Sequence, residues 1–217
     1  AIEQSFVVMF VKMLRTVPES ERLEFGSEQD RLGMTLLHRA ACSGDIEPIK
    51  AILDVYPESD RLHAVNLEDM FNRTVLHHVA RSGNVESLKF ILSLYTESEE
   101  QLQAVITQDS SYGSLLHLVA RYGNFECFKI VLELLPESER LRTVCLEDFR
   151  NKTVLHCAAE SGNVECIKTI IELYPESECL EALNSRDRNG WTVLHYAARS
   201  GKIECVEMIF SLYPESE

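Results

Sequence analysis

Apolar residues recur along the chain at spacings that predict pairs of short helices. In residues 164–174 they fall three or four positions apart, on one face of a helix: Val164, Ile167, Ile170, Ile171 and Tyr174. A shorter apolar run, 154–159, comes just before. Thr153 can cap the N-terminus of this first helix with its hydroxyl, and Gly162 can adopt the left-handed conformation that ends it. The pattern predicts a helix–turn–helix unit.

The same pattern occurs five times. Each copy opens with Thr or Ser, two apolar residues and a histidine, and these motif histidines are 39 or 40 residues apart: His38, His77, His117, His156 and His195. All second helices but one are followed by Pro-Glu-Ser, which predicts a third short helix or turn because proline suits the first position of a helix. We expect one leucine per copy to anchor this third segment: Leu23, Leu62, Leu102, Leu141 and Leu180.

The copies form a single predicted array over residues 1–217. They divide it into four full repeats between two partial ones: 1–34, 35–73, 74–113, 114–152, 153–191 and 192–217. A unit this small cannot bury its apolar face alone, so neighbouring units have to stack as a solenoid. Because the chain begins and ends inside a repeat, we expect it to be a piece of a longer array.

These repeats resemble the ankyrin repeat, whose signature is Thr-Pro-Leu-His-x-Ala. As in that family, an aspartate lies eight residues before each motif histidine: Asp30, Asp69, Asp109, Asp148 and Asp187. A residue that tolerates positive φ follows in four copies: Gly33, Asn72, Asn151 and Gly190. In the third copy Tyr112 stands in this slot, so we expect a distorted turn in which Gly113 takes over.

The resemblance implies an all-α ankyrin-repeat solenoid of helix–turn–helix units, with β-turn fingers and an extra short helix or turn per repeat. The sequence departs from the family in two respects. Val or Leu replaces the motif proline, and the period is 39 residues rather than about 33. Long, near-identical repeats of this kind are similar to those of ankyrin proteins of intracellular bacteria, which are often secreted effectors.

Net charge and cysteine content limit which binding partners and which cellular compartment we expect. The formal charge is −14, from 21 basic and 35 acidic residues, which argues against binding to nucleic acid. No apolar stretch has the length of about 20 residues that membrane insertion requires. The seven cysteines are an odd number without a CxxC pair, a pattern typical of reduced thiols. We therefore expect a cytoplasmic protein, in the host cytosol if it is a bacterial effector.

The motif histidines could in principle form a metal site, and a cysteine could act as a catalytic nucleophile. We consider both kinds of site unfavoured by the sequence. Stacked helices lie roughly 8–10 Å apart, whereas a zinc ligand lies ~2 Å from its metal, so equivalent histidines cannot easily share an ion. The resemblance implies instead that each imidazole hydrogen-bonds its own turn. Cys157 adjoins His156, and adjacent residues do not form a nucleophile–base pair. We expect Cys127, Cys166 and Cys205 to pack in the core, and we expect no catalytic residue, metal or cofactor.

The resemblance places partner binding on a concave face formed by the fingers and the exposed side of each first helix. Arginines, aromatic residues and a few others occupy these positions: Met70, Phe71, Arg73, Arg81, Arg121, Tyr122, Phe149, Arg150, Lys152, Arg188, Trp191 and Arg199. Arg, Trp and Tyr are enriched in binding hot spots. The alternative is that the finger aromatics pack against neighbouring fingers and the arginines pair with the finger aspartates.

We therefore expect non-catalytic recognition of another protein through an acidic or apolar segment of that partner. Two alternatives remain: the array is the targeting module of a larger enzyme or secreted effector whose catalytic domain lies elsewhere, or it is an architectural spacer. The acidic Pro-Glu-Ser turns form a second candidate surface, expected to be a solvated ridge. The apolar ends of the array leave self-association open, since terminal repeats normally need polar caps.

Overall fold

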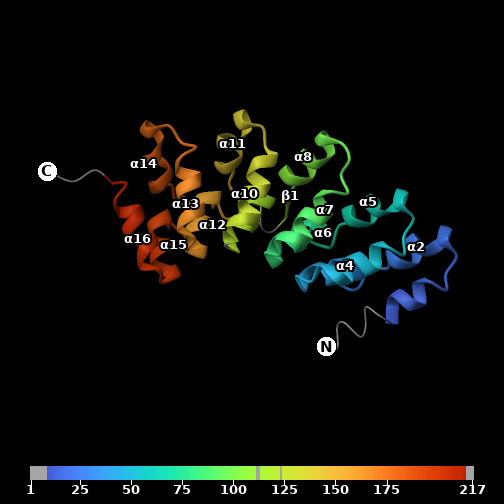
Figure 1. Cartoon of the computed structure of the whole chain (residues 1–217). Coiled ribbons are helices and arrows are strands. Elements are labelled where there is room, and N and C mark those ends of the chain that lie inside the picture. The colour runs from blue at the N-terminus through green and yellow to red at the C-terminus, as the bar shows by residue number, and fades with distance from the viewer. Residues whose placement is uncertain (1–8, 111–112, 123, 214–217) are drawn as a thin grey trace. The chain divides into compact units, whose positions relative to one another are not determined.

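The computed structural model of the chain describes residues 9–110, 113–122 and 124–213. These fall into two compact units, divided between Ala104 and Val105. Helices make up nearly all the regular structure of both units (Figure 1). In the described part of the chain, none of the helices has the length and apolarity needed to cross a membrane.

The first unit contains residues 9–14 as a helical segment, followed by a short third segment and two helix–turn–helix repeats. Its elements are η1 (Glu19–Glu21), α2 (Arg22–Gly26), α3 (Leu36–Cys42), α4 (Ile46–Leu53), α5 (Glu58–Asn66), α6 (Val75–Ser82), α7 (Val85–Leu92) and the start of α8 (Ser98–Ile106). First helices pack on first helices, α3 on α6, and second on second, α4 on α7.

The second unit continues the same order. Its elements are β1 (Gln108–Asp109), β2 (Gly113–Ser114), α9 (Leu115–Arg121), α10 (Phe125–Leu134), α11 (Glu137–Val144), α12 (Val154–Ser161), α13 (Val164–Ile171), α14 (Glu176–Asn184), α15 (Val193–Ser200) and α16 (Ile203–Phe210). β1 and β2 pair antiparallel, Gln108 with Ser114 and Asp109 with Gly113. Helix α12 lies between α9 and α15, and α13 packs on both α10 and α16. The all-α repeat fold expected from the sequence is confirmed.

The caps of the helices follow from local side-chain chemistry. Each first helix begins after Thr or Ser, whose hydroxyl oxygen accepts a hydrogen bond from the backbone N–H of the motif histidine. The second helices of four repeats begin after Asp or Asn, and the side-chain oxygen of each accepts a backbone N–H of the first turn: Asp45, Asn84, Asn124 and Asn163. The core between the layers is apolar, and Cys127, Cys166 and Cys205 are fully buried in it. Their predicted packing role is confirmed.

The third segments that follow Pro57, Pro136 and Pro175 are short helices, and each begins one residue later than the sequence suggested. Pro57 precedes α5 as its N-cap, with φ −51°, rather than occupying its first turn. The predicted leucine anchors are also wrong in position. Leu62 is only half-buried and Leu180 is exposed, while the residue three positions further on is buried against the array in four repeats: Val65, Val105, Val144 and Leu183. Because three residues make almost one helical turn, both positions lie on the same side of the helix, and the later one reaches the core.

Asparagine and glycine occupy the left-handed positions of the fingers. Asn72 and Asn151 have φ values of 57° and 59°, and Gly113 has φ 78°. A Cβ at Gly113 would lie 3.0 Å from the His117 ring, so this glycine is required by both conformation and space. The expectation that Gly113 carries the turn of the third copy is therefore confirmed. Tyr112 lies outside the described residues.

One buried hydroxyl in α7 predicts a stabilising substitution. Ser87 is fully buried, and its Oγ finds no hydrogen-bond partner among the described residues, whereas cysteine stands at the matching position of the next three repeats. Replacing Ser87 with cysteine should raise the free energy of unfolding by about 1 kcal/mol, because it removes an unsatisfied buried polar group at nearly constant volume. Urea unfolding would measure this. The exposed Ser138→Cys is the control and should change stability by less than about 0.5 kcal/mol; a loss of stability in Ser87→Cys would contradict the argument.

Candidate functional site

The finger that precedes each first helix is folded around its aspartate. Oδ1 of Asp69 accepts the backbone N–H of Phe71 at 2.8 Å and of Arg73 at 3.1 Å. Asp148 accepts in the same way from Arg150 at 2.8 Å and Lys152 at 3.0 Å. Burial opposes ionisation of Asp69, but these hydrogen bonds and that of His78 outweigh it and lower the pKa of the carboxyl. Asp69 and Asp148 therefore shape their fingers from inside, and because they are buried they are not available to a partner.

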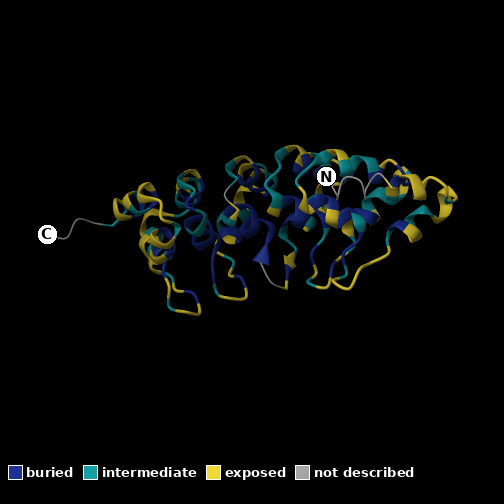
Figure 2. Ribbon diagram, turned by 90° about the horizontal axis from the view of Figure 1, so that it is seen from below, coloured by how far each residue is buried: buried dark blue, intermediate teal, exposed yellow. Residues whose placement is uncertain are grey.

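Neighbouring fingers are joined by backbone hydrogen bonds within each unit. The N–H of Met70 donates to the carbonyl of Leu32 at 3.0 Å, and the N–H of Arg188 donates to the carbonyl of Arg150 at 2.9 Å. Figure 2 shows the finger loops projecting from the helices, with exposed residues at their tips and buried residues at their bases. The tips are thus held at a set spacing while their side chains face water.

Three of the motif histidines, His38, His117 and His156, connect their first helix to the next finger along the chain. Nδ1 of His117 lies 3.3 Å from the backbone N of Ser114, from which it accepts a hydrogen bond. On the other side of the ring, Nε2–H donates to the carbonyls of Leu146 at 3.0 Å and Lys152 at 3.1 Å, in the next finger. His38 and His156 make the corresponding contacts in their repeats. Since one nitrogen faces a donor and the other an acceptor, the ring is the neutral Nε2–H tautomer.

The structural reading of these histidines is confirmed. All five contact their own capping residue through Nδ1, from His38 to His195. Burial lowers the pKa of His38, His117 and His156, which keeps their rings neutral. His195 is exposed. Within the ranges the structure describes, His, Cys, Asp and Glu nowhere form a group of three or more that could hold a metal ion.

The residues expected to contact a partner fall into three groups by exposure. Eight are exposed: Met70, Arg81, Tyr122, Phe149, Arg150, Arg188, Trp191 and Arg199. Phe71 and Arg121 are half-buried. Arg73 and Lys152 are buried, with 8% and 2% of their surface exposed. The sequence placed all twelve on one surface because it gave the position along the finger but not the direction of each side chain.

Arg73 and Lys152 are held inside by contacts that the sequence did not show, so we remove them from the candidate surface. Nε of Arg73 lies 3.2 Å from Oδ2 of Asp69, and its guanidinium stacks on Phe71 at 4.4 Å. Nζ of Lys152 lies 2.9 Å from Oε2 of Glu160 and 4.1 Å from the centre of the Tyr196 ring. Each cation is thus neutralised by a carboxylate and covered by an aromatic ring.

Comparison with known proteins places these repeats in a family. The family described as "Ankyrin repeats (3 copies)" matches residues 10–103, 37–140, 94–179 and 116–216, which together span nearly the whole chain. The chain is an ankyrin-repeat protein. No curated protein matches it in sequence. Ankyrin repeats are generally protein–protein interaction modules, and ankyrin domains are typically non-catalytic.

In the second unit, the first helices of this ankyrin protein carry a polar row centred on Glu160. Its carboxylate lies 2.9 Å from Nζ of Lys152, 3.5 Å from Nε of Arg121 and 3.8 Å from a guanidinium nitrogen of Arg199. Arg121 also lies 3.5 Å from Oδ2 of the buried Asp148. The alternative in which arginines pair with the finger aspartates therefore describes Arg121, beside Asp148, and Arg73, beside Asp69. Arg150 and Arg188 remain at the exposed fingertips.

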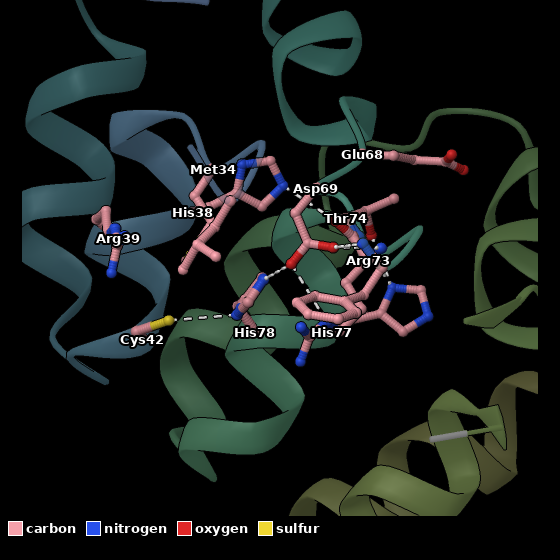
Figure 3. Close-up of polar contacts among 12 residues, drawn as sticks. Met34, His38, Arg39, Cys42, Glu68, Asp69, Arg73, Thr74, His77 and His78 are labelled. Atoms are coloured by element: carbon pink, nitrogen blue, oxygen red, sulfur yellow. Dashed lines mark hydrogen bonds and ion pairs between the residues drawn. The ribbon is translucent and has the colours of Figure 1, made fainter. Parts of the chain in front are cut away.

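The ankyrin stack of the first unit brings together three residues that sequence reasoning did not connect. Sγ of Cys42 lies 3.2 Å from Nδ1 of His78, and Nε2 of His78 lies 3.0 Å from Oδ2 of Asp69 (Figure 3). Burial lowers the pKa of His78 to about 4. The signal in the sequence was a spacing: Arg121 and Cys157, at the matching positions of the second unit, are also 36 residues apart and in contact at 3.5 Å.

Proposed function

We propose that the second unit binds an acidic segment of another protein through its fingertips and the end of α15. The proposed surface consists of Phe149, Arg150, Arg188, Trp191 and Arg199, here called the finger surface. The observation that supports it is an inversion of charge. Asp148 and Asp187 are buried at the finger bases, whereas Arg150 and Arg188 are exposed at the tips of a protein whose formal charge is −14.

Aromatic rings and arginines are stacked in pairs on this surface. The guanidinium of Arg150 lies 5.0 Å from the centre of the Phe149 ring, and that of Arg199 lies 5.7 Å from the centre of the Trp191 ring. Nε of Arg188 donates to Oδ1 of Asn151 at 2.9 Å, which leaves other donors of the same guanidinium for a ligand. Stacking reduces the number of conformations that each arginine has to lose on binding, and arginine can bind a carboxylate through two N–H groups.

The chemistry of the finger surface defines its partner. Carboxylates of the bound segment would meet Arg150, Arg188 and Arg199, while apolar side chains would pack on Phe149 and Trp191. Complementary charge of this kind raises the rate of encounter and makes it sensitive to salt. The sequence-based alternative, a targeting module within a larger enzyme or effector, requires the same surface and stays a prediction.

The test is selection of partners from a displayed library of protein segments, followed by measured affinities. The double variant Arg188→Ala/Trp191→Ala should weaken a selected acidic segment by roughly 30-fold or more, since truncated hot-spot residues typically cost about 2 kcal/mol or more. The matched control is Glu176→Gln/Glu178→Gln on the exposed first turn of α14, which should leave affinity within about twofold. Circular dichroism would verify that both variants keep the helicity of the parent.

Two results would contradict the proposal. One is a partner retained equally by the parent and the finger-surface variant but lost by the α14 variant, which would place binding on the acidic turns. The other is selection of predominantly basic segments. Affinity that falls as salt rises, together with loss in the finger-surface variant alone, is the supporting result.

A further inference from the structure

We propose that the finger surface of one copy of this chain binds helix α14 of a second copy. The inference rests on the proposed function, since it names the acidic segment that the finger surface takes. Both surfaces belong to the second unit, so the contact requires no particular arrangement of the two units. It is supported by an acidic helix with an exposed apolar side chain and by fingertip arginines without an acidic partner.

Helix α14 is acidic and presents one large apolar side chain to water. It contains three glutamates and no basic residue, whereas α5 and α11 each contain arginine. Glu176, Glu178 and Glu181 are exposed, and none of the ion pairs in the described part of the chain involves them. Leu180 is 37% exposed and lies one helical turn after Glu176, on the same face. The helix therefore offers carboxylates beside an apolar side chain.

The finger surface presents the complementary chemistry at the tips of the fingers (Figure 2). Arg150 and Arg188 form no ion pair with any residue that the structure describes. The aromatic side chains of this surface, Phe149 and Trp191, are 46% and 36% exposed. An acidic helix with an apolar side chain meets both needs at once. Its carboxylates pair with the guanidinium groups, while Leu180 packs on an aromatic ring.

Opposite charges lie on different surfaces of the same unit, which favours association of copies in spite of their net charge. Two chains of formal charge −14 repel each other at long range. At about 0.1 M salt the Debye length is ~10 Å, so charges farther than this from the contact are largely screened. The attraction between fingertips and α14 acts at contact distance and persists. Association is therefore expected at this salt concentration, and it should weaken at about 1 M salt, where the Debye length is ~3 Å.

The proposed contact joins two different patches, the finger surface of one copy and α14 of the other. Each copy carries one patch of each kind, so a copy that has lost one patch can still contribute the other. Two variants that each lack a different patch should consequently fail to associate alone and associate when they are mixed.

The experiment is sedimentation equilibrium of the intact chain in about 0.1 M salt, from about 10 µM to about 1 mM protein. The weight-average mass of the parent should rise above the monomer mass of 24.7 kDa as the concentration rises. The finger-surface variant Arg188→Ala/Trp191→Ala and the α14 variant Glu176→Gln/Glu178→Gln should each weaken association by about tenfold or more. An equimolar mixture of these two variants should restore a complex of two chains.

A matched control is available in α11. Glu137→Gln/Glu139→Gln removes the same charges from the same helical positions, but in a helix that also contains arginine. This variant should leave association within about twofold of the parent, since exposed charges away from the contact contribute little. Circular dichroism would verify that every variant keeps the helicity of the parent.

A parent that stays monomeric at about 1 mM would overturn the inference. So would association that either patch variant retains, association that strengthens with salt, or a mixture of the two variants that forms no complex. Failure of the proposed function is distinguishable, because the finger-surface variant is tested separately against acidic segments from a library. A monomeric parent whose finger surface binds such segments contradicts only the inference, whereas a finger-surface variant that keeps both kinds of binding contradicts both.

Discussion

Replacing His117 with alanine is expected to lower the free energy of unfolding of the second unit by about 4 kcal/mol. The substitution leaves a cavity at a side chain that is only 1% exposed, and such changes typically cost about 2–5 kcal/mol. It also removes the acceptor of the Ser114 N–H and the donor to the carbonyls of Leu146 and Lys152. Unsatisfied buried polar groups cost about 1–3 kcal/mol, so the upper part of the combined range is expected.

His195→Ala separates the two contacts of the ring, the one with its own helix cap and the one with the next finger. Nδ1 of His195 lies 3.2 Å from the backbone N of Thr192, as that of His117 lies beside Ser114, but His195 is exposed and no following finger lies against it within the described residues. Its loss should cost about 1 kcal/mol, the typical contribution of a helix cap. Urea unfolding followed by circular dichroism measures both variants. Equal losses would show that the contact with the next finger contributes little to the stack.

Lowering the pH from 6.5 toward 4 is expected to destabilise the chain, and the loss begins above the pH range in which carboxylates ordinarily titrate. The pKa of His78 falls from 6.5 to about 4 on folding because of burial. The folded protein therefore binds fewer protons than the unfolded one in this window, and stability rises with pH there. The contribution is fully present above pH 6.5 and is lost as the pH falls to about 4. At 1.36 kcal/mol per unit, His78 alone accounts for about 3 kcal/mol.

Three further buried histidines act in the same direction, since burial also lowers the pKa values of His38, His117 and His156. Urea midpoints measured at pH 7.5, 6, 5 and 4.5 would show the loss. His78→Gln should flatten part of the profile, because it removes the ring whose pKa is lowered to about 4. A free energy of unfolding that is constant from pH 7.5 to 4.5 would contradict the neutral, buried state of these rings.

Most of the fold was predictable because its signals are local. Thr153 and His156 lie three residues apart on one helical turn, so their capping contact depends on no other part of the chain. Asp148 accepts hydrogen bonds from the backbone N–H groups two and four positions ahead, which is equally local. Asn163 caps α13 by accepting the backbone N–H of Cys166, three positions ahead. The repetition of these signals at one period then predicted stacking, since each unit leaves an apolar face to cover.

The candidate site was only partly predictable. Arg73 lies four residues after its finger aspartate and Arg150 lies two residues after its own, and this offset of two residues turns Arg73 inward to Asp69 and leaves Arg150 at the tip. Lys152 lies at the position of Arg73. The carboxylate that it contacts is Glu160 on α12, the helix that follows its finger, and the aromatic ring is Tyr196 on α15, one repeat further along. Long cationic side chains can turn either way, and the carboxylate within reach decides which.

There is a physical reason why the sequence alone predicts some contacts while others appear only in the tertiary structure. Helix starts, finger turns and the repeat itself arise from contacts between residues a few positions apart, which the order of amino acids specifies directly. The pairing of Cys42 with His78, the packing of Lys152 on Tyr196 and the bond from His117 to the next finger join residues about one repeat apart in the chain. Such contacts exist only once neighbouring repeats have stacked, because stacking decides which side chains share a buried space and which face water.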